Sequence, residues 1–262
     1  MKADVLFDLF YTDKSIDERI ALVADAGWEA VETWKGGDAA ELKMIGDACA
    51  RRGIDFVSIV MNFNGEADVA PLCKKNRAGF LERIDRFSDN ALAAGCKAGI
   101  VTSGDRIAGR GYHAQMQALI DALAEAAQQV ASKGFLLNLE PLNDKVDHPG
   151  YFLVSREEAA DIVKTVGSPN LRFLYDLYHQ QIMDGNHTSF LEANIEWIGH
   201  FHAAGVPGRH EIFLGEMDYP YIVRRIRGLG YEGYMGLEYV PSTEHAESLR
   251  KTVEYLSSAL TE

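Results

Sequence analysis

Four side chains that can bind a metal ion each end an apolar segment of the chain: Glu140, Asp176, His202 and Glu238. Three carboxylates and one imidazole suit a divalent cation such as Mg²⁺, Mn²⁺ or Co²⁺. Carboxylates brought together repel one another and are costly to remove from water, and a bound dication offsets both costs. A single acid after a strand is more often a helix N-cap or a solvated residue. The recurrence of such residues at successive segment ends therefore favours one divalent metal site.

These side chains can meet only if the segments that carry them run side by side. Amphipathic, helix-like stretches separate eight short apolar segments, which we predict as strands at 5–9, 29–33, 54–60, 97–103, 134–140, 171–176, 197–202 and 233–238. This alternation predicts an α/β fold, a (β/α)8 TIM barrel with a single domain spanning residues 1–262. The carboxyl ends of all barrel strands open onto one face, where such enzymes have their active sites. A doubly wound open sheet is the alternative, weakened because no G-x-G-x-x-G follows the first strand.

Local signals mark the ends of the helices between these strands. The S-x-x-E pattern at Ser15 and again at Ser155 predicts helix starts with capping boxes. Pro220 suits the first turn of a helix. Glycines that precede the next strand, such as Gly53 and Gly167, suit helix C-caps.

Composition excludes several classes of protein. The chain has 262 residues, 47% of them hydrophobic, and a formal net charge of −13. Such a charge repels nucleic acid and anionic membranes at long range, so we expect neither as a partner. The three cysteines form no CxxC pair, and acidic residues interrupt the apolar start MKADVLFDLF. We expect a cytoplasmic protein that acts on a small molecule, with homo-oligomerisation left open.

Several motifs around the four candidate ligands resemble those of a known family. The matching segments are NLEPLN (138–143), YDLYHQQIMDGN (175–186), HFHAAGVPGRHE (200–211) and GLEYVP (236–241). They resemble the hydroxypyruvate isomerase family, which belongs to the xylose isomerase-like TIM barrels together with the ketose 3-epimerases. The detailed match covers residues 134–241, and the first half of the chain agrees in layout.

The resemblance implies a function for several residues. It implies one divalent metal ion held by Glu140, Asp176, the residue at position 202 and Glu238, with Glu140 and Glu238 as the catalytic acid/base pair. His179 and Arg209 match positions that touch substrate in related enzymes, and Asn143 and His148 lie in the loop after the fifth strand, where either could reach substrate. Trp34 and Phe7 are candidates either for the apolar wall of the pocket or for the core. We expect His200 on the opposite side of its strand from His202, packed against a helix.

The sequence departs from the family pattern at several places, including the loop MNFNGEADVAPLCKKNR after the third strand and TSGD after the fourth. His202 stands where hydroxypyruvate isomerases usually carry Gln and the 3-epimerases carry His. The segment EIFLGE (211–216) replaces the usual EPxxGE. These departures leave the substrate open within one chemical class.

The expected reaction is a metal-dependent isomerisation of a small α-hydroxy carbonyl compound through a cis-enediolate. Hydroxypyruvate, giving tartronate semialdehyde, or a related oxo acid is the expected substrate, with Arg209 binding its carboxylate. The alternatives are a ketose 3-epimerase or other sugar isomerase, a metal phosphodiesterase on the same barrel, and a carbohydrate-binding barrel without catalysis.

Overall fold

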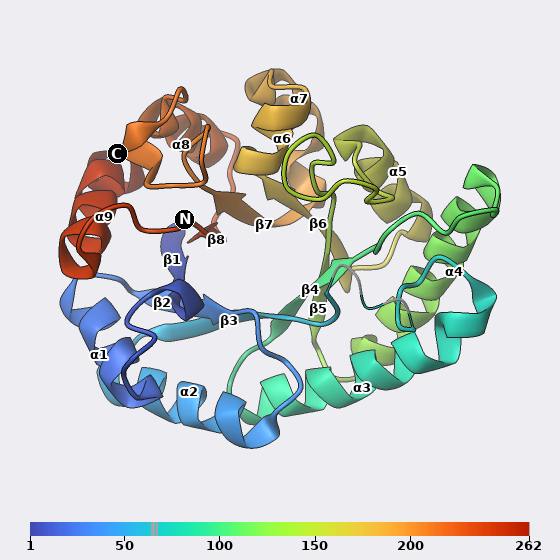
Figure 1. The fold of residues 1–262 in the computed structure, drawn as a ribbon, viewed down its shortest axis with the longest axis horizontal. Helices are drawn as coiled ribbons and strands as arrows, with labels where there is room; N and C mark the ends of the chain where they lie inside the picture. The colour runs from blue at the N-terminus through green and yellow to red at the C-terminus, as the bar shows by residue number, and fades with distance from the viewer. Residues whose placement is uncertain (64–65, 67, 262) are drawn as a thin grey trace.

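A computed structural model describes residues 1–63, 66 and 68–261. Eight parallel strands form a closed barrel in chain order, so β1 pairs with both β2 and β8, and the predicted (β/α)8 fold is confirmed (Figure 1). The strands are β1 (Lys2–Leu6), β2 (Ala30–Thr33), β3 (Asp55–Val60), β4 (Ala98–Thr102), β5 (Leu136–Glu140), β6 (Leu171–Asp176), β7 (Ile198–Ala203) and β8 (Tyr234–Leu237).

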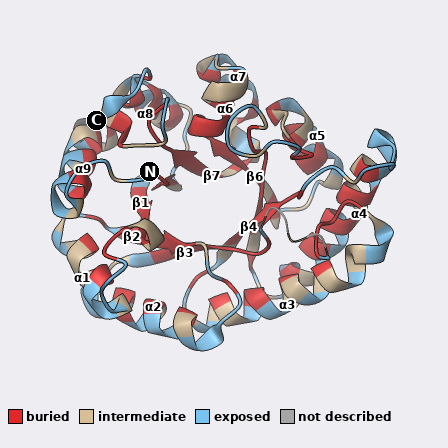
Figure 2. Ribbon diagram, viewed as in Figure 1, coloured by how far each residue is buried: buried red, intermediate tan, exposed pale blue. Residues whose placement is uncertain are grey.

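The helices form a ring outside the barrel (Figure 1). They are α1 (Ile16–Asp25), α2 (Ala39–Arg52), α3 (Arg77–Ala93), α4 (Tyr112–Ala131), α5 (Arg156–Val166), α6 (Leu177–Met183), α7 (His187–Asn194), α8 (Tyr219–Gly228) and α9 (His245–Thr261). Short 3₁₀ turns add η1 (Phe7–Leu9), η2 (Lys74–Asn76), η3 (Ile195–Trp197) and η4 (Ile212–Leu214). Buried residues lie on the strands and on the helix faces turned toward them (Figure 2). This is the core expected of strands covered by helices.

The first strand begins and ends earlier than its apolar pattern predicted. We predicted residues 5–9, but the strand is Lys2–Leu6, and Phe7–Leu9 forms the turn η1. Hydrogen bonding to β8 sets this position, because residues 2 to 5 pair in register with Tyr234 to Leu237. The buried Arg19 guanidinium donates to the carbonyl oxygens of Phe7 and Phe10 and so stabilises the turn. Distant partners therefore override the local apolar run.

Most of the predicted helix-end signals are present. Ser15 forms the full capping box with Glu18, and Pro220 lies in the first turn of α8. The Ser155 side chain accepts a hydrogen bond from the backbone N–H of Glu158. The second half of that capping box is missing, because the Glu158 carboxylate accepts a hydrogen bond from the hydroxyl of Tyr112. Gly53 and Gly167 end α2 and α5 in the left-handed conformation, which glycine adopts without steric cost.

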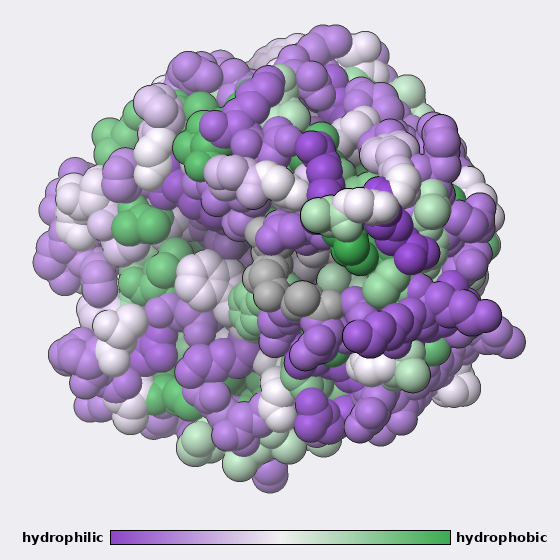
Figure 3. Space-filling view, turned by 45° about the vertical axis from the view of Figure 1, so that its right-hand side comes forward, coloured by the Kyte–Doolittle hydropathy of each residue, from purple (hydrophilic) through white to green (hydrophobic). Residues whose placement is uncertain are grey.

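The face of the molecule shown in Figure 3 is mostly hydrophilic. The face shown in Figure 3 carries only small, separate apolar patches. Within the part of the chain that the structure describes, no helix combines the length and the apolar character needed to cross a bilayer.

Gly46 tests how tightly the helix ring is packed. A Cβ at Gly46 would overlap the backbone carbonyl of Ala94 at the end of α3, whereas a Cβ at Gly228 would meet no described atom within 4 Å. We expect Gly46→Ala to lower the free energy of unfolding by about 1–3 kcal/mol, because the two helix backbones must move apart. Gly228→Ala is the control and should be neutral or stabilising by up to about 1 kcal/mol. Urea denaturation of both variants measures this, and equal stability would contradict the packing argument.

Candidate active site

The four candidate ligands come together at the carboxyl ends of the strands. Each of Glu140, Asp176, His202 and Glu238 is buried and offers one ligand atom, and these four atoms all lie within 4.8 Å of one another. Nδ1 of His202 lies 3.0 Å from Oε2 of Glu238 and 3.6 Å from Oε1 of Glu140. Barrel closure therefore brings together residues from β5, β6, β7 and the end of β8.

Asp176 is both a helix cap and a member of this cluster. Its Oδ1 accepts from the backbone N–H groups of Tyr178 at 2.7 Å and His179 at 3.3 Å, which caps α6. The second oxygen remains available for the cluster. Burial raises the pKa of Asp176 to about 7, and the charges of Glu140 and Glu238 add to the rise. The carboxyl group therefore needs a nearby positive charge to be ionised fully at neutral pH.

Glu238 is held by two hydrogen-bonding groups on the pocket side. Trp34 donates its indole N–H to Oε1 at 2.9 Å, and the guanidinium of Arg209 lies 2.9 Å from Oε2. Burial alone would raise the pKa of Glu238, but the charges of Arg209 and His202 outweigh it and hold the pKa well below its usual range. Glu238 is therefore an ionised carboxylate in a fixed orientation.

Two buried atoms of the cluster lack hydrogen bonds. Nδ1 of His202 and Oε1 of Glu140 have no hydrogen-bond partner among the described residues. Burial lowers the pKa of His202, but the charge of Glu32 and the neighbouring glutamates outweigh it and raise that pKa well above its usual value. Buried polar atoms without hydrogen-bond partners are costly. Their arrangement fits a divalent cation that would accept electron pairs from both atoms.

A hollow of about 430 Å³ opens above the cluster. Its lining includes Glu140, Glu238, Trp34, Thr102, Leu142, Val60, Phe63, His148, His179 and Arg209. Trp34 thus forms part of the wall, while Phe7 packs in the hydrophobic core. The size suits a small molecule.

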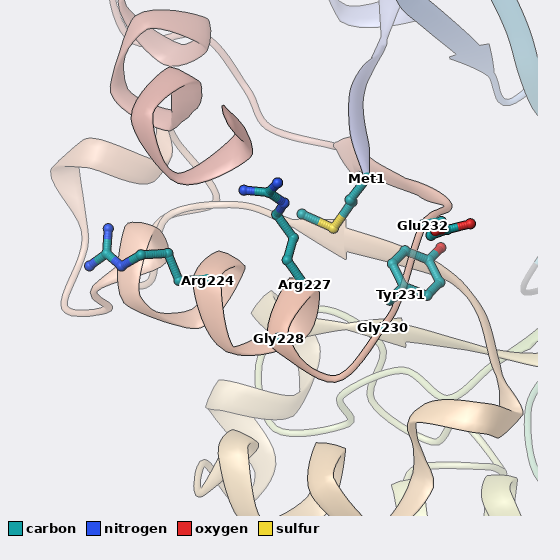
Figure 4. Close-up of a pocket in the computed structure, with 7 residues that line it drawn as sticks. All are labelled: Met1, Arg224, Arg227, Gly228, Gly230, Tyr231 and Glu232. Carbon is teal, nitrogen blue, oxygen red and sulfur yellow. The ribbon is translucent and has the colours of Figure 1, made fainter. Parts of the chain in front are cut away.

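A second hollow, of about 420 Å³, lies at the other end of the barrel, where α8 leads into β8 (Figure 4). It is lined by Met1, Arg224, Arg227, Gly228, Gly230, Tyr231 and Glu232. None of these residues belongs to the carboxylate cluster. We therefore place the candidate active site at the carboxyl ends of the strands.

His179 lies beside the cluster with its ring orientation set by Asn143. Nδ1 of His179 accepts from the backbone N–H of Asn143 at 3.2 Å, and Nε2 lies 3.5 Å from Oδ2 of Asp176. Burial lowers the pKa of His179 well below its usual value, so the ring is neutral and carries its proton on Nε2. The ring of His148 lies 5.4 Å from that of His179.

Asn143 is near the site but is not among the lining residues of the hollow. Its Nδ2 donates to Asp147 at 2.6 Å, and its Oδ1 accepts from the backbone of Val146 and Asp147. These bonds stabilise the loop that follows β5. The arrangement indicates a structural task in holding His179, and the predicted contact of Asn143 with substrate remains a prediction.

His200 is not packed against a helix, so our expectation for it was wrong. Residues two apart in a strand point to the same face, and His200 therefore lies inside the barrel with His202. Nε2 of His200 is 3.3 Å from Oε2 of Glu32, a buried acid on β2 that we had not singled out. The sequence did contain one signal for Glu32, because it is the lone carboxylate within the buried strand AVET.

The structure is a closed (β/α)8 barrel whose buried cluster of three carboxyl groups and one imidazole is compatible with a metal site. A family model described as "Xylose isomerase-like TIM barrel" matches residues 20–259 of the chain. The chain belongs to this family. Within it the chain is hydroxypyruvate isomerase-like, as the sequence motifs predicted. It is 33% identical over 254 residues to the human protein named "Putative hydroxypyruvate isomerase", covering 92% of this chain and 90% of that one.

Two further comparisons give a second isomerase relative and a solved structure with the same fold. A 2-oxo-tetronate isomerase of Cupriavidus necator is 40% identical over 137 residues, covering 52% of each chain. Among solved structures, one titled as an AP endonuclease of family 2 from Brucella melitensis superposes with a TM-score of 0.87 at 30% identity, covering 97% of this chain and 99% of that one.

Proposed function

We propose that this protein is a divalent-metal-dependent isomerase of a small 2-oxo acid. The preferred substrate is hydroxypyruvate, giving tartronate semialdehyde, or a close relative of it. One observation carries the proposal: two glutamates of the four-residue cluster also line a hollow of about 430 Å³ that contains Arg209. The names of the similar proteins, hydroxypyruvate isomerase and 2-oxo-tetronate isomerase, support the same class of substrate.

Glu140, Asp176, His202 and Glu238 would hold the metal ion, since their donor atoms are close, buried and partly unpaired. Once bound, a divalent ion polarises a carbonyl group and makes the neighbouring C–H more acidic. Mg²⁺, Mn²⁺ and Co²⁺ all suit a set of three carboxylates and one imidazole.

The two glutamates would transfer the proton. One carboxylate of Glu140 and Glu238 removes a proton from the carbon that bears the hydroxyl group, which leaves an enediolate. The same carboxylate after reorientation, or the other one if it is protonated, returns a proton to the former carbonyl carbon, while a proton moves from the hydroxyl oxygen to the second oxygen. Atoms and electrons balance without an oxidant. Both carboxylates line the hollow, as proton transfer at hydrogen-bonding distance requires.

Arg209 and His179 would bind and orient the substrate. The guanidinium of Arg209 lines the hollow, and its planar fork can bind both oxygens of a carboxylate. The neutral ring of His179 has an Nε2 atom without a hydrogen-bond partner among the described residues, so it can donate to a substrate oxygen. Trp34 and Leu142 provide apolar walls that exclude water.

Proton exchange with D₂O tests the proposal. The protein with Mg²⁺ is incubated with hydroxypyruvate, tetronate-type oxo acids and free ketoses, and ¹H NMR follows the proton on the carbon next to the carbonyl. We expect metal-dependent exchange and isomerisation of an oxo acid. A carbohydrate-binding barrel without catalysis would give no exchange with any compound, which would overturn the proposal.

A ketose 3-epimerase is the second candidate. It is favoured by His202, because the resembling 3-epimerases carry His at this position. Returning the proton to the opposite face of the same carbon would epimerise the substrate rather than isomerise it. Exchange at carbon 3 of a ketose, with no exchange in the oxo acids, would support this alternative.

A metal phosphodiesterase acting on DNA is disfavoured by the net charge of −13, which repels a nucleic acid. The isomerase and the phosphodiesterase should also bind different numbers of metal ions, because a phosphodiesterase of this fold would need more metal ligands. We expect a single divalent ion per chain in atomic absorption measurements.

Arg209→Met should weaken substrate binding, and kcat should fall as well because Arg209 also contacts Glu238. Loss of charge-assisted hydrogen bonds worth about 1.5–3 kcal/mol should raise the KM for the oxo acid by about 10–100-fold. Steady-state kinetics measure this. Arg224→Met, in the hollow at the opposite end, is the control and should leave KM unchanged. An unchanged KM in Arg209→Met would contradict a role in binding the substrate carboxylate.

A further inference from the structure

Glu32 is a charged residue in the interior of the barrel. It lies on β2, its side chain is 1% exposed, and its Oε1 and Oε2 lie 3.0 and 3.1 Å from Nε2 of His202. TIM barrels usually fill this interior with branched apolar side chains. An acid there loses hydration and needs a specific partner. One of its partners, His202, is a member of the candidate metal cluster.

We infer that Glu32 is a positioning residue that holds the His202 ring with Nδ1 turned toward the carboxylates of Glu140, Asp176 and Glu238. This inference rests on the proposed metal-dependent function.

The two nitrogens of His202 have different surroundings. Nε2 faces the carboxylate of Glu32, which can only accept a hydrogen bond when ionised, so Nε2 carries a proton. Nδ1 has no aligned hydrogen bond within the described part of the chain, although Oε2 of Glu238 is 3.0 Å away. A ring held in this way points Nδ1 at the carboxylates, and a cation bound there would take the place of a proton on Nδ1. This is the nitrogen that would bind a cation.

The strand arrangement leaves space for the Glu32–His202 pair. Gly236 is the register partner of both His202 and Asp4 on the neighbouring strands. A Cβ at Gly236 would overlap Oε1 of Glu32 and lie 2.9 Å from Cδ2 of His202. Any larger residue on β8 at this position would therefore displace the contact.

His200 supports Glu32 from deeper in the barrel, with Nε2 3.3 Å from Oε2 of Glu32. On its other side, Oε2 of Glu32 lies 3.1 Å from Nε2 of His202. Glu32 is therefore fixed between two rings, and it can fix the ring of His202 in turn.

Metal affinity provides the test, because it does not depend on turnover. Mn²⁺ binding to metal-free protein is measured at constant pH by the EPR signal of free Mn²⁺. We expect Glu32→Ala to weaken binding by about 10–100-fold. Glu32→Gln should lose less, since its amide oxygen can still accept from Nε2. Glu211→Gln removes another fully buried acid, one bonded to Ser242 and Ser248, and should not change Mn²⁺ affinity.

A double-mutant cycle shows whether Glu32 acts through His202. In a His202→Gln background, whose amide oxygen can still bind the ion, Glu32→Ala should change Mn²⁺ affinity by less than about twofold. The inference is overturned if Glu32→Ala and Glu32→Gln bind Mn²⁺ like wild type, or if the loss is equally large without His202. If wild-type protein binds no Mn²⁺, Mg²⁺ or Co²⁺, the proposed metal-dependent function fails instead. Circular dichroism confirms that each variant is folded.

Discussion

Glu140→Gln and Glu238→Gln should each lower kcat by at least about 10³-fold, because each removes one of the two proton-transferring carboxylates. Gln has nearly the same size and retains one oxygen, so both variants should fold like wild type. Turnover of the oxo acid identified by NMR gives the effect on kcat. Metal is added to saturation, because the replaced carboxylates are also candidate ligands. Near wild-type turnover in either variant would rule out the two-glutamate mechanism.

The same two variants can also distinguish the two steps. The variant that lacks the base should neither isomerise the substrate nor exchange its proton with D₂O. The variant that lacks the acid should still exchange the proton without forming product. Glu192→Gln, an exposed acid paired with Arg225, is the control and should keep both activities. Loss of activity in the control would point to a general effect of acid removal.

Removal of divalent metal should abolish turnover and lower the melting temperature. Four buried ligand atoms within 4.8 Å of one another include three from carboxyl groups, whose mutual repulsion a cation relieves. Mn²⁺ at about 100 times its Kd should stabilise the fold by about 2.7 kcal/mol. For a chain of this length this corresponds to a rise in Tm of about 5–10 °C. Thermal melts of EDTA-treated protein, with and without added Mn²⁺, measure the shift.

Asp176→Asn provides a matched control for this prediction. An Asn side chain caps helices about as well as Asp, so α6 should keep its N-terminus. The variant lacks the charge of one candidate ligand, and Mn²⁺ should therefore raise its Tm by less than in wild type. An equal Tm for wild-type protein with and without metal would contradict a metal site at this cluster.

The repeated pattern of short apolar segments and amphipathic stretches was enough to predict the barrel. Periodicity, caps and turn glycines depend on residues close together in the chain, so they can be read locally. The capping box at Ser15 and the C-cap at Gly53 are examples. The proximity of Glu140, Asp176, His202 and Glu238 also followed, since a closed parallel barrel brings all strand ends to one face.

Local pattern was insufficient where a partner from a distant segment decides the outcome. The apolar run 5–9 reads as a strand, but pairing with β8 sets the strand at Lys2–Leu6. The backbone N–H of Asn143 donates to His179, 36 residues away in the chain, and no local pattern indicates that contact.

The sequence by itself determined the types of residue at the strand ends and the order of the elements that carry them. The tertiary structure alone decided which buried groups meet inside the barrel. Glu32 contacts His202 across 170 residues of chain, and no spacing or periodicity within β2 or β7 indicates that pair. The physical reason is that side chains inside a barrel find their partners only when the first and last strands close the cylinder.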